Sequence, residues 1–557
     1  MAVDTLQELK RTERYTKRLG RMKLERSSFE SHWKDLTDNL LPRSGRYFLE
    51  DRNSGLRRNL AIYDSTATRA LNVLAAGMMS GMSSPSRKWF DLELSNPKLN
   101  DDPDVKIWLE ESVEIIQEVF ARSNVYRVLH GLYEELATFG TACAMLFEDK
   151  NDIIRLYPQT AGEYYIAQNN RYVVDTVYRE FQMQIGPMGQ EFGRGKLSRA
   201  SQDLWDKGHL DEWVTVIHAV QPRKNLDPQK RDSKNMPWES VFIETQAEEG
   251  GFLRESGFAQ FPALVPRWIV RGGDVYGSDC PGMTSLGDIK QLQDNQLKKA
   301  KGIDYMTDPP LQVPTALRGS EDVLPGGISY YDPNAPTGGI RTAYEVQLNL
   351  QHLLEDINDV RNRINGAFFV DLFQMMALSD RRQITAREVD ERSAEKLLVL
   401  GPTLERNQNE LLGPLIDQTF FILQKNELLP PPPEAIINQD LQIKYVSMLA
   451  QAQRAVGLES LDALVSRVGN MAQFRPDALD KLDSDRIVDE YAEVLGTPVE
   501  MVVSTAKARQ ARQAKAEQMK ALQQQQAIPE IANTAKTLSE TETSDGTALD
   551  TLIAQQE

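Results

Sequence analysis

The sequence predicts an α+β protein of several domains, and three patterns support this prediction. Apolar residues recur every three or four positions over long segments in the first and last thirds of the chain, which is the spacing of amphipathic helices. Between about residues 142 and 268 they alternate with polar residues in short runs broken by glycine, which is the spacing of strands. A proline- and glycine-rich stretch, residues 304–342, separates two further helical segments.

The length, net charge and cysteine content of the sequence limit the classes of protein to which it can belong. A chain of 557 residues is longer than one hydrophobic core usually organises, so we expect several domains or an elongated subunit of an assembly. The net charge of −17 has the wrong sign for a protein that grips nucleic acid with its whole surface. Two cysteines, Cys143 and Cys280, fit a reducing compartment, and we expect neither a secretion signal nor a membrane span.

Four helices are predicted before the β-rich region, at Leu6 to Leu40, Asp64 to Met82, Asp104 to Phe120 and Val125 to Phe139. The first contains a basic stretch that begins at Lys10, with acidic residues among and beside it. This pattern admits a solvated helix face or a DNA-binding arm, and we favour the solvated face.

Two helical segments bracket the proline- and glycine-rich stretch, one from Leu286 to Ile303 and the other from Ala343 to Gly366. The stretch has short β-prone runs around Gln312 and Tyr330, so it is too structured in pattern for a flexible linker. The segment that follows, Ala367 to Gln383, is too apolar for a solvated loop. We expect that segment to pack against its neighbours or to move between states.

The longest helical pattern runs from Ile384 to Pro433 and contains two Gly-Pro steps, at 401–402 and 413–414. Because proline removes a backbone donor and crowds the preceding turn, this helix should bend twice or divide. The segments predicted after it are further helices within Leu441 to Leu495, a basic helix from Thr505 to Gln526 and a disordered tail from Pro529 to Glu557.

No catalytic or metal-binding pattern is found in the sequence. The five histidines are scattered, with no HExxH motif and no Cys/His spacing suited to zinc. The segment from Gly77 to Gly81 lacks the spacing of a nucleophile elbow and lies within a predicted helix. We therefore predict no catalytic residue, no metal and no cofactor.

Three strings in the second half resemble a known family. ITAREVDERSAEKLLVLGP (Ile384 to Pro402), ELLGPLIDQTFFILQKNELLPPPP (Glu410 to Pro433) and LQIKYVSMLAQAQR (Leu441 to Arg454) resemble the head-to-tail connector, or portal, proteins of short-tailed bacteriophages. Arg387 and Met448 depart from the family pattern, which usually has Thr and Pro there. A less specific resemblance extends from Phe29 to about Arg454.

The resemblance implies a portal fold with a mainly helical wing, stem and crown, a β-rich wing part and a small α/β clip. The implied layout is wing 1–280, with its β-rich part at 142–268, stem helix 281–303, clip 304–342, stem helix 343–366, tunnel loop 367–383, long kinked wing helix 384–430, crown and C-terminal helices 431–526, and disordered tail 527–557.

The resemblance also implies a channel whose contacts with DNA come from a few basic residues. The candidates are Lys298, Lys299 and Lys301 on the first stem helix, Arg341 near the second, and Arg381 and Arg382 at the tip of the tunnel loop. Phe373, Met375 and Met376 belong to the same loop, which lines the constriction in the family. A surface turn with an Arg pair at a helix start is the alternative for this loop.

The implied function is structural. Copies of the chain would form a ring, a dodecamer by the resemblance, at one vertex of the capsid in the virion, after assembly in the host cytoplasm. Double-stranded DNA would pass through it, driven by a terminase, and the further partners would be the major capsid and scaffolding proteins, a tail adaptor and internal core or ejection proteins. Two alternatives remain from the sequence: a cytoplasmic multidomain hydrolase or nuclease with an unrecognised site, and a different ring component of a tail.

Overall fold

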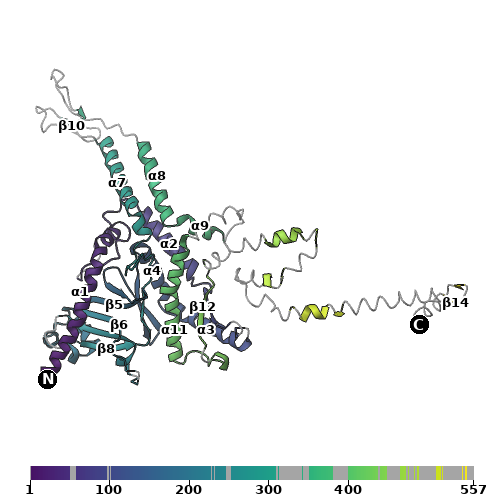
Figure 1. Ribbon diagram of the computed structural model, residues 1–557. Coiled ribbons are helices and arrows are strands. Elements are labelled where there is room, and N and C mark those ends of the chain that lie inside the picture. Colours follow the sequence, from purple (N-terminus) through teal and green to yellow (C-terminus); the bar gives the residue numbers. More distant parts are fainter. Residues whose placement is uncertain are drawn as a thin grey trace, which may run out of the picture. The chain divides into compact units, whose positions relative to one another are not determined.

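The computed structural model describes residues 2–49, 58–96, 99–100, 102–227, 229–230, 232–245, 252–308, 311–312, 341–342, 350–379, 399–436, 439–447, 449, 464–471, 474–475, 482, 484, 486–488, 508, 510–515, 517–518, 542–543 and 546–547. The chain forms two compact units, Met1–Gln453 and Arg454–Glu557. Figure 1 shows its helices and strands coloured along the sequence, and the mixture confirms the predicted α+β class.

The first four helices of the chain have bounds close to the predicted ones: α1 (Ala2–Asn39), α2 (Thr66–Met82), α3 (Pro103–Arg122) and α4 (Val125–Phe139). Helix α3 begins where an Asp102 side-chain oxygen accepts a hydrogen bond from the Asp104 N–H at 3.0 Å, with Pro103 in the first turn. Helix α4 ends at Gly140, whose φ of 73° lies in the left-handed region that favours glycine.

Two antiparallel sheets lie within residues 142–268, where strands were predicted. The smaller has the order β3-β2-β9, from β2 (Cys143–Asp149), β3 (Ile153–Gln159) and β9 (Ala263–Leu264). The larger is a meander of β4 (Tyr164–Gln168), β5 (Val174–Gln184), β6 (Trp213–Pro222), β7 (Trp238–Glu244) and β8 (Phe252–Phe258). Its connections contain α5 (Ile185–Phe192), η1 (Arg194–Lys196), α6 (Arg199–Asp206) and η2 (Ser233–Asn235).

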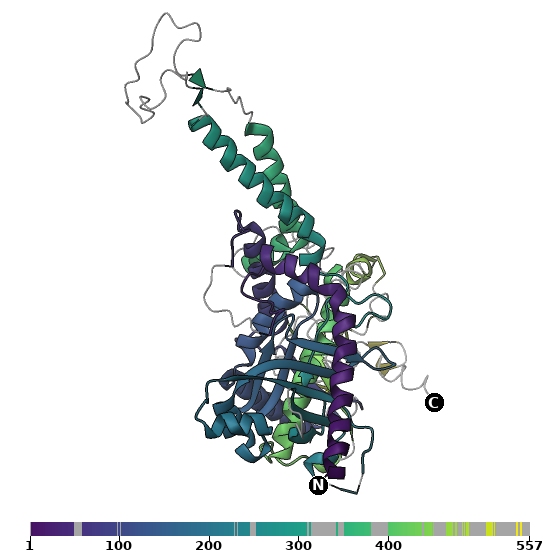
Figure 2. The ribbon, with the colours of Figure 1, turned by 90° about the vertical axis from the view of Figure 1, so that its left-hand side faces the viewer.

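Helix α1 lies across one face of the five-stranded sheet (Figures 1 and 2). Its buried side carries Tyr15, Leu19 and Met22, which join sheet residues in one apolar cluster. Some of its basic side chains also bind the sheet, since Arg18 donates to the Thr176 hydroxyl at 3.1 Å and Lys23 pairs with Glu180 at 2.5 Å. Some basic residues of α1 therefore form contacts within their own chain.

Helices α7 (Pro281–Thr307) and α8 (Leu350–Ala367) form a pair, called the stem pair below, that projects from the rest of the first unit (Figure 1). They cover the two helical segments predicted around the proline- and glycine-rich stretch. Within that stretch β10 (Leu311–Gln312) pairs antiparallel with β11 (Arg341–Thr342), which places a strand on the β-prone run around Gln312. The run around Tyr330 lies outside the described residues.

The segment predicted as a loop at 367–383 is helical for most of its length, as α9 (Val370–Ser379). The helix forms because this part of the segment contains no glycine or proline to interrupt it. Its apolar residues do pack against neighbours as predicted: Phe368, Leu372 and Phe373 are buried in the largest core. A Cβ added at Gly77 of α2 would meet the Phe373 ring at 2.2 Å, so the close contact between α2 and α9 requires glycine there.

The long helix near the end of the first unit is helical from 399 to 425, with a π-helical turn, η4 (Gln408–Leu412), before α11 (Gly413–Lys425). The turn absorbs the step at Gly413-Pro414, because the Gly413 N–H bonds to the Gln408 carbonyl five residues back. The predicted interruption at Gly413-Pro414 is therefore a π-helical turn and not a division of the helix, and at Gly401-Pro402 the described residues continue as helix. Residues 384–398 lie outside the described part of the chain.

A strand closes the first unit where helices were predicted. After η5 (Glu434–Ile436), β12 (Leu441–Tyr445) pairs antiparallel with β1 (Phe90–Leu94). The prediction of helices from Leu441 onward is wrong for this stretch, because its apolar residues alternate with polar ones and β1 offers a partner edge.

The second unit is helical at 464–471, within the region predicted to contain helices. Its exposed apolar residues include Leu464, Met471 and Phe474. In the tail predicted as disordered, β13 (Glu542–Thr543) pairs with β14 (Gly546–Thr547).

Candidate functional site

The base of the stem pair is fastened by a polar network around Asp64, just before α2. One Asp64 oxygen accepts hydrogen bonds from Arg361 of α8 and from Gln296 of α7, both at 2.8 Å, and the other accepts from Thr66. Burial raises the pKa of Asp64, but these hydrogen bonds outweigh it and lower the pKa to about 2. An ionised Asp64 thus joins the start of α2 to both stem helices.

A second polar layer joins the two stem helices directly. Asn295 of α7 donates to the Asp356 carboxylate of α8 at 2.6 Å, and Arg363 of α8 lies 3.4 Å from Asp288 of α7. The apolar residues that are buried in the same pair are Ile289, Leu292, Ile357, Val360 and Ile364. The inner half of the pair is therefore held by both apolar packing and directional polar contacts.

The three predicted lysines lie on the outer half of α7. Lys298 pairs with Asp294 one turn away at 2.6 Å, and its side chain is 66% exposed. Lys301 is exposed and Lys299 half-buried. Because helical residues are about 100° apart, Lys298 and Lys301 share one side of α7 and Lys299 lies around the helix from them. Nearby apolar side chains are also exposed: Ile303, Tyr305, Met306 and Leu354.

The remaining predicted site residues are not brought together with these lysines. Phe373 is buried against α2 near the base of the stem pair, and Met375 is half-buried on α9. Met376 belongs to α9 and Arg341 to β11, but their side chains lie outside the described residues, as do Arg381 and Arg382 entirely.

A buried ion pair anchors the π-helical turn to the β-rich region. Glu410 in the turn accepts hydrogen bonds from the Arg267 guanidinium at 2.7 Å and from the Arg267 N–H at 2.9 Å. The Arg267 side chain is 2% exposed and also donates to the Gln168 side chain and to the Tyr172 carbonyl. Arg406, one turn earlier, reaches the same carboxylate at 3.0 Å. The turn thus places Glu410 where it neutralises a buried arginine.

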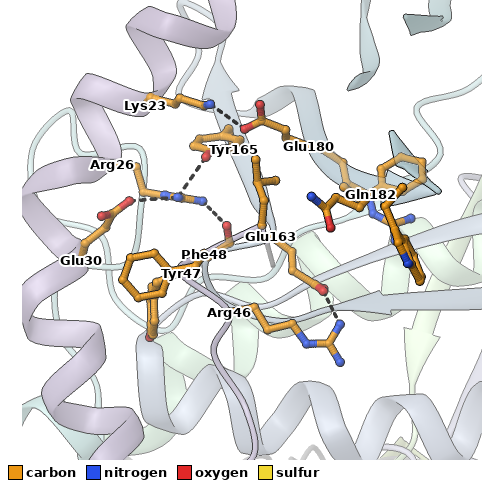
Figure 3. Close-up of a pocket in the computed structure, with 15 residues that line it drawn as sticks. Lys23, Arg26, Glu30, Arg46, Tyr47, Phe48, Glu163, Tyr165, Glu180 and Gln182 are labelled. Carbon is orange, nitrogen blue, oxygen red and sulfur yellow. Dashed lines mark hydrogen bonds and ion pairs between the residues drawn. The ribbon is translucent and has the colours of Figure 1, made fainter. Parts of the chain in front are cut away.

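A pocket of about 790 Å³ lies between α1, the loop before residue 50 and the five-stranded sheet (Figure 3). Three ion pairs cross or border it: Lys23–Glu180, Arg26–Glu30 and Arg46–Glu163. Arg26 also lies 3.8 Å above the Tyr165 ring and donates to two backbone carbonyls. Because most of its charges are paired with one another and Arg179 lies over the Phe181 ring, the pocket has the character of a structural joint.

Both cysteines and one histidine, His218, are buried in the first unit. Cys143 and Cys280 are buried, and burial raises the pKa of both thiols, so that they remain protonated. Burial lowers the pKa of His218 to about 3, which keeps its ring neutral. The described residues contain no group of three His, Cys, Asp or Glu side chains arranged for a metal ion. None of the described helices has the length and apolar character needed to cross a membrane.

The sequence analysis missed both polar anchors. Asp64 accepts a hydrogen bond from the Thr66 N–H at the start of α2, but nothing in the local pattern indicates its stem partners about 230 and 297 residues away. Arg267 and Glu410 are likewise 143 residues apart. A buried ion pair leaves no periodic signal, so only the fold reveals it.

Comparison with known proteins places these features in a family. The family model described as "Bacteriophage head to tail connecting protein" matches residues 12–502. The chain is 49% identical over 533 residues to the "Probable portal protein" of Bordetella phage BPP-1, covering 96% of each chain. It is 44% identical over 538 residues to the "Portal protein" of Salmonella phage epsilon15, covering 96% of this chain and 97% of that one.

A solved structure, from the virion of a native gene transfer agent particle, aligns with 84% of this chain and 99% of its own at 11% identity and a TM-score of 0.35, which is too low to show a shared fold. The family match and the two relatives are sufficient without it, since each spans most of the chain. The resemblance noted in the sequence is confirmed, and this protein belongs to the bacteriophage head-to-tail connecting protein family.

Proposed function

We propose that copies of this chain close into a ring, a dodecamer by analogy with the family, around an axial channel at one capsid vertex. Double-stranded DNA passes inward through the channel during packaging and outward at ejection. The observation that carries this proposal is the near full-length match to two proteins named as portals. The projecting stem pair supports it, because apolar and basic side chains are exposed among the described residues of its outer half.

The basic residues of the stem pair supply the contacts with DNA. Lys298, Lys299 and Lys301 repeat around a ring as a belt of positive charge, to which Arg341, Arg381 and Arg382 add. The chain as a whole is acidic, so the belt attracts phosphates locally while most of the wall repels them. Weak contacts of this kind let a duplex slide where tight ones would hold it.

The proposed partners follow from the place of the ring in the particle. A terminase supplies the force for packaging, the major capsid and scaffolding proteins surround the ring, a tail adaptor attaches to it, and internal core or ejection proteins meet it from inside. The chain itself acts mechanically and electrostatically and catalyses no reaction. No observation on the described residues favours a hydrolase or a nuclease, because they present no metal cluster and the Ser240 hydroxyl that lies 3.0 Å from His218 is buried.

Negative-stain microscopy of the purified chain tests this proposal. We expect closed rings with an axial hole about as wide as a duplex. A chain that remains a solitary globule at all concentrations would contradict the ring. Open stacks or tubes would instead support a different tail component. Purified rings that cut DNA or hydrolyse ATP, with the activity abolished by a point change, would contradict the purely structural role.

A further inference from the structure

One side of α1 is left uncovered by the described residues of the first unit. Arg14, Lys17, Arg21 and Leu24 follow one another at steps of three, four and three residues, so they form a stripe on the side opposite the buried Tyr15. All four are exposed, and Leu24 is 75% exposed. Lys17 pairs with Glu13 one turn away, where both side chains are mostly exposed, and no ion pair is formed by Arg14 or Arg21 within the described residues.

Helix α3 carries a matching stripe of opposite charge. Ile107, Glu111, Glu114 and Glu118 follow at steps of four, three and four residues, opposite a buried side that includes Val113. Ile107 is 56% exposed. Glu118 has a weak contact with Arg122 at 3.9 Å, and no ion pair is formed by Glu111 or Glu114 in the part of the chain that the structure describes.

The two stripes are complementary when the helices run antiparallel. Leu24 then faces Ile107, Arg21 faces Glu111, Lys17 faces Glu114 and Arg14 faces Glu118. At 1.5 Å per residue, the α1 stripe is about 15 Å long and the α3 stripe about 16 Å, so the register is kept over the whole contact. Each stripe has one aliphatic side chain at one end and three charges of a single sign after it.

The positions of the helices decide what can bring the stripes together. Figure 1 shows α1 along the left side of the first unit and α3 on its right, and Figure 2, which looks at the left-hand side, has α1 in front. Helices on opposite sides of one unit cannot meet within one chain. We propose that the α1 stripe of one copy docks antiparallel on the α3 stripe of the next copy.

This contact is heterologous, since two different surfaces meet, and repeated head-to-tail contacts of that kind close into a ring when the rotation between copies allows. The inference therefore rests on the proposed ring and names the surfaces that close it. Three ion pairs of opposite charge set the orientation and register, and the aliphatic pair excludes water at one end.

Charge reversal tests the pairing. Arg21→Glu and Glu111→Arg should each raise the protein concentration needed for half-assembly by tenfold or more, as measured by sedimentation velocity. The double variant Arg21→Glu, Glu111→Arg should restore assembly, because the pair is re-formed with its signs exchanged. The matched controls are Lys150→Glu and Glu212→Arg, which reverse exposed charges on turns of the β-rich region and should leave assembly unchanged.

Disulfide trapping tests the same contact without changing its charges. Leu24→Cys with Ile107→Cys in one chain should give a ladder of linked copies on a non-reducing gel, since both native cysteines are buried. Leu24→Cys with Val173→Cys, which pairs the same position with an exposed residue between β4 and β5, should not.

The outcomes separate this inference from the proposed function. Three outcomes would each overturn the α1–α3 interface and leave the proposed ring intact. Both single charge-reversal variants could assemble as readily as the wild type, or the double reversal could fail to restore assembly. Alternatively, the Leu24→Cys, Ile107→Cys protein could form rings without giving the disulfide ladder. A wild-type chain that never assembles would remove the ring and this interface with it.

Discussion

Charged residues inside the first unit and charged residues on the stem pair are used in opposite ways. Arg267 is almost fully buried, and Glu410 neutralises it through several hydrogen bonds. Lys298 is two-thirds exposed, and its partner Asp294 is similarly solvated. The first pair is part of the packing between distant segments, whereas the second adds little to the fold of a single chain.

The difference shows where each region can have a role beyond its own chain. A charge that is enclosed and neutralised by its own chain has no capacity left for a partner, and its loss must weaken the fold. A charge in water on an outer helix is available to a partner, and the fold does not depend on it. Three changes test this contrast, in decreasing order of their expected effect on stability.

Glu410→Ala should give the largest loss. It leaves the Arg267 guanidinium buried without its counter-charge, and removing one member of a buried ion pair typically costs about 3–5 kcal/mol. Chemical denaturation should show this loss, with the transition moved to lower denaturant concentration. Glu405→Ala, at an exposed position of the same helix, is the matched control and should change stability by less than about 0.5 kcal/mol. Equal stability of the two variants would show that the pair does not anchor the π-helical turn.

Glu135 is an enclosed carboxyl group, and the pH dependence of protein stability tests whether it is charged. Burial raises the pKa of this α4 residue to about 7, although hydrogen bonds from Thr160 and the Ala161 N–H favour its charged form, and nearby Glu163, itself paired with Arg46, raises the pKa further. The folded protein therefore holds a proton that the unfolded chain releases near pH 4.5. Its contribution to stability is fully present below that pH and is lost as pH rises through about 7.

Glu135→Gln should remove this pH dependence, because the amide keeps the shape and cannot ionise. The variant should match the wild type near pH 4.5 and exceed it in stability above pH 8 by an amount on the order of 3 kcal/mol. Unfolding curves collected from pH 4.5 to pH 8.5 measure the difference. A constant offset between the two proteins across that range would mean that Glu135 is charged throughout.

The helices were predictable from the sequence where local pattern and tertiary packing agree. Val125–Phe139 matches its predicted bounds because an apolar stripe leads to a glycine that ends the helix with positive φ. The stem helices were also predictable from local signals, because the insert between them is rich in proline and glycine. The sequence predicts an interruption at the Gly413-Pro414 step. Its form depends on a hydrogen bond from the Gly413 N–H to the carbonyl five residues back, at Gln408, and no periodic pattern in the sequence indicates that bond.

The errors and omissions in the sequence prediction have a common cause, which is dependence on distant partners. Leu441–Tyr445 becomes a strand because β1, some 350 residues earlier, offers an edge to pair with. Among the candidate site residues, Phe373 is buried because Gly77 leaves room for its ring. The lysines of α7 were predictable as exposed charges on a helix, since a solvated helix face is itself a local property.

Replacing the three stem lysines should have the smallest effect on stability and the clearest effect on DNA. With Lys298→Ala, Lys299→Ala and Lys301→Ala together, we expect stability to change by less than about 0.5 kcal/mol per site, because none of them is enclosed. Purified rings should bind a short duplex weakly at low salt, and the slope of log K against log salt should decrease by about 0.9 for each phosphate contact that the variant loses. The matched control is Lys150→Ala, Lys207→Ala and Lys224→Ala, which removes three exposed lysines of the β-rich region. If both triple variants keep the wild-type salt slope, the stem lysines do not face the DNA. If the salt slope decreases by the same amount in both variants, DNA binding follows the net charge of the protein and not the belt of lysines on α7.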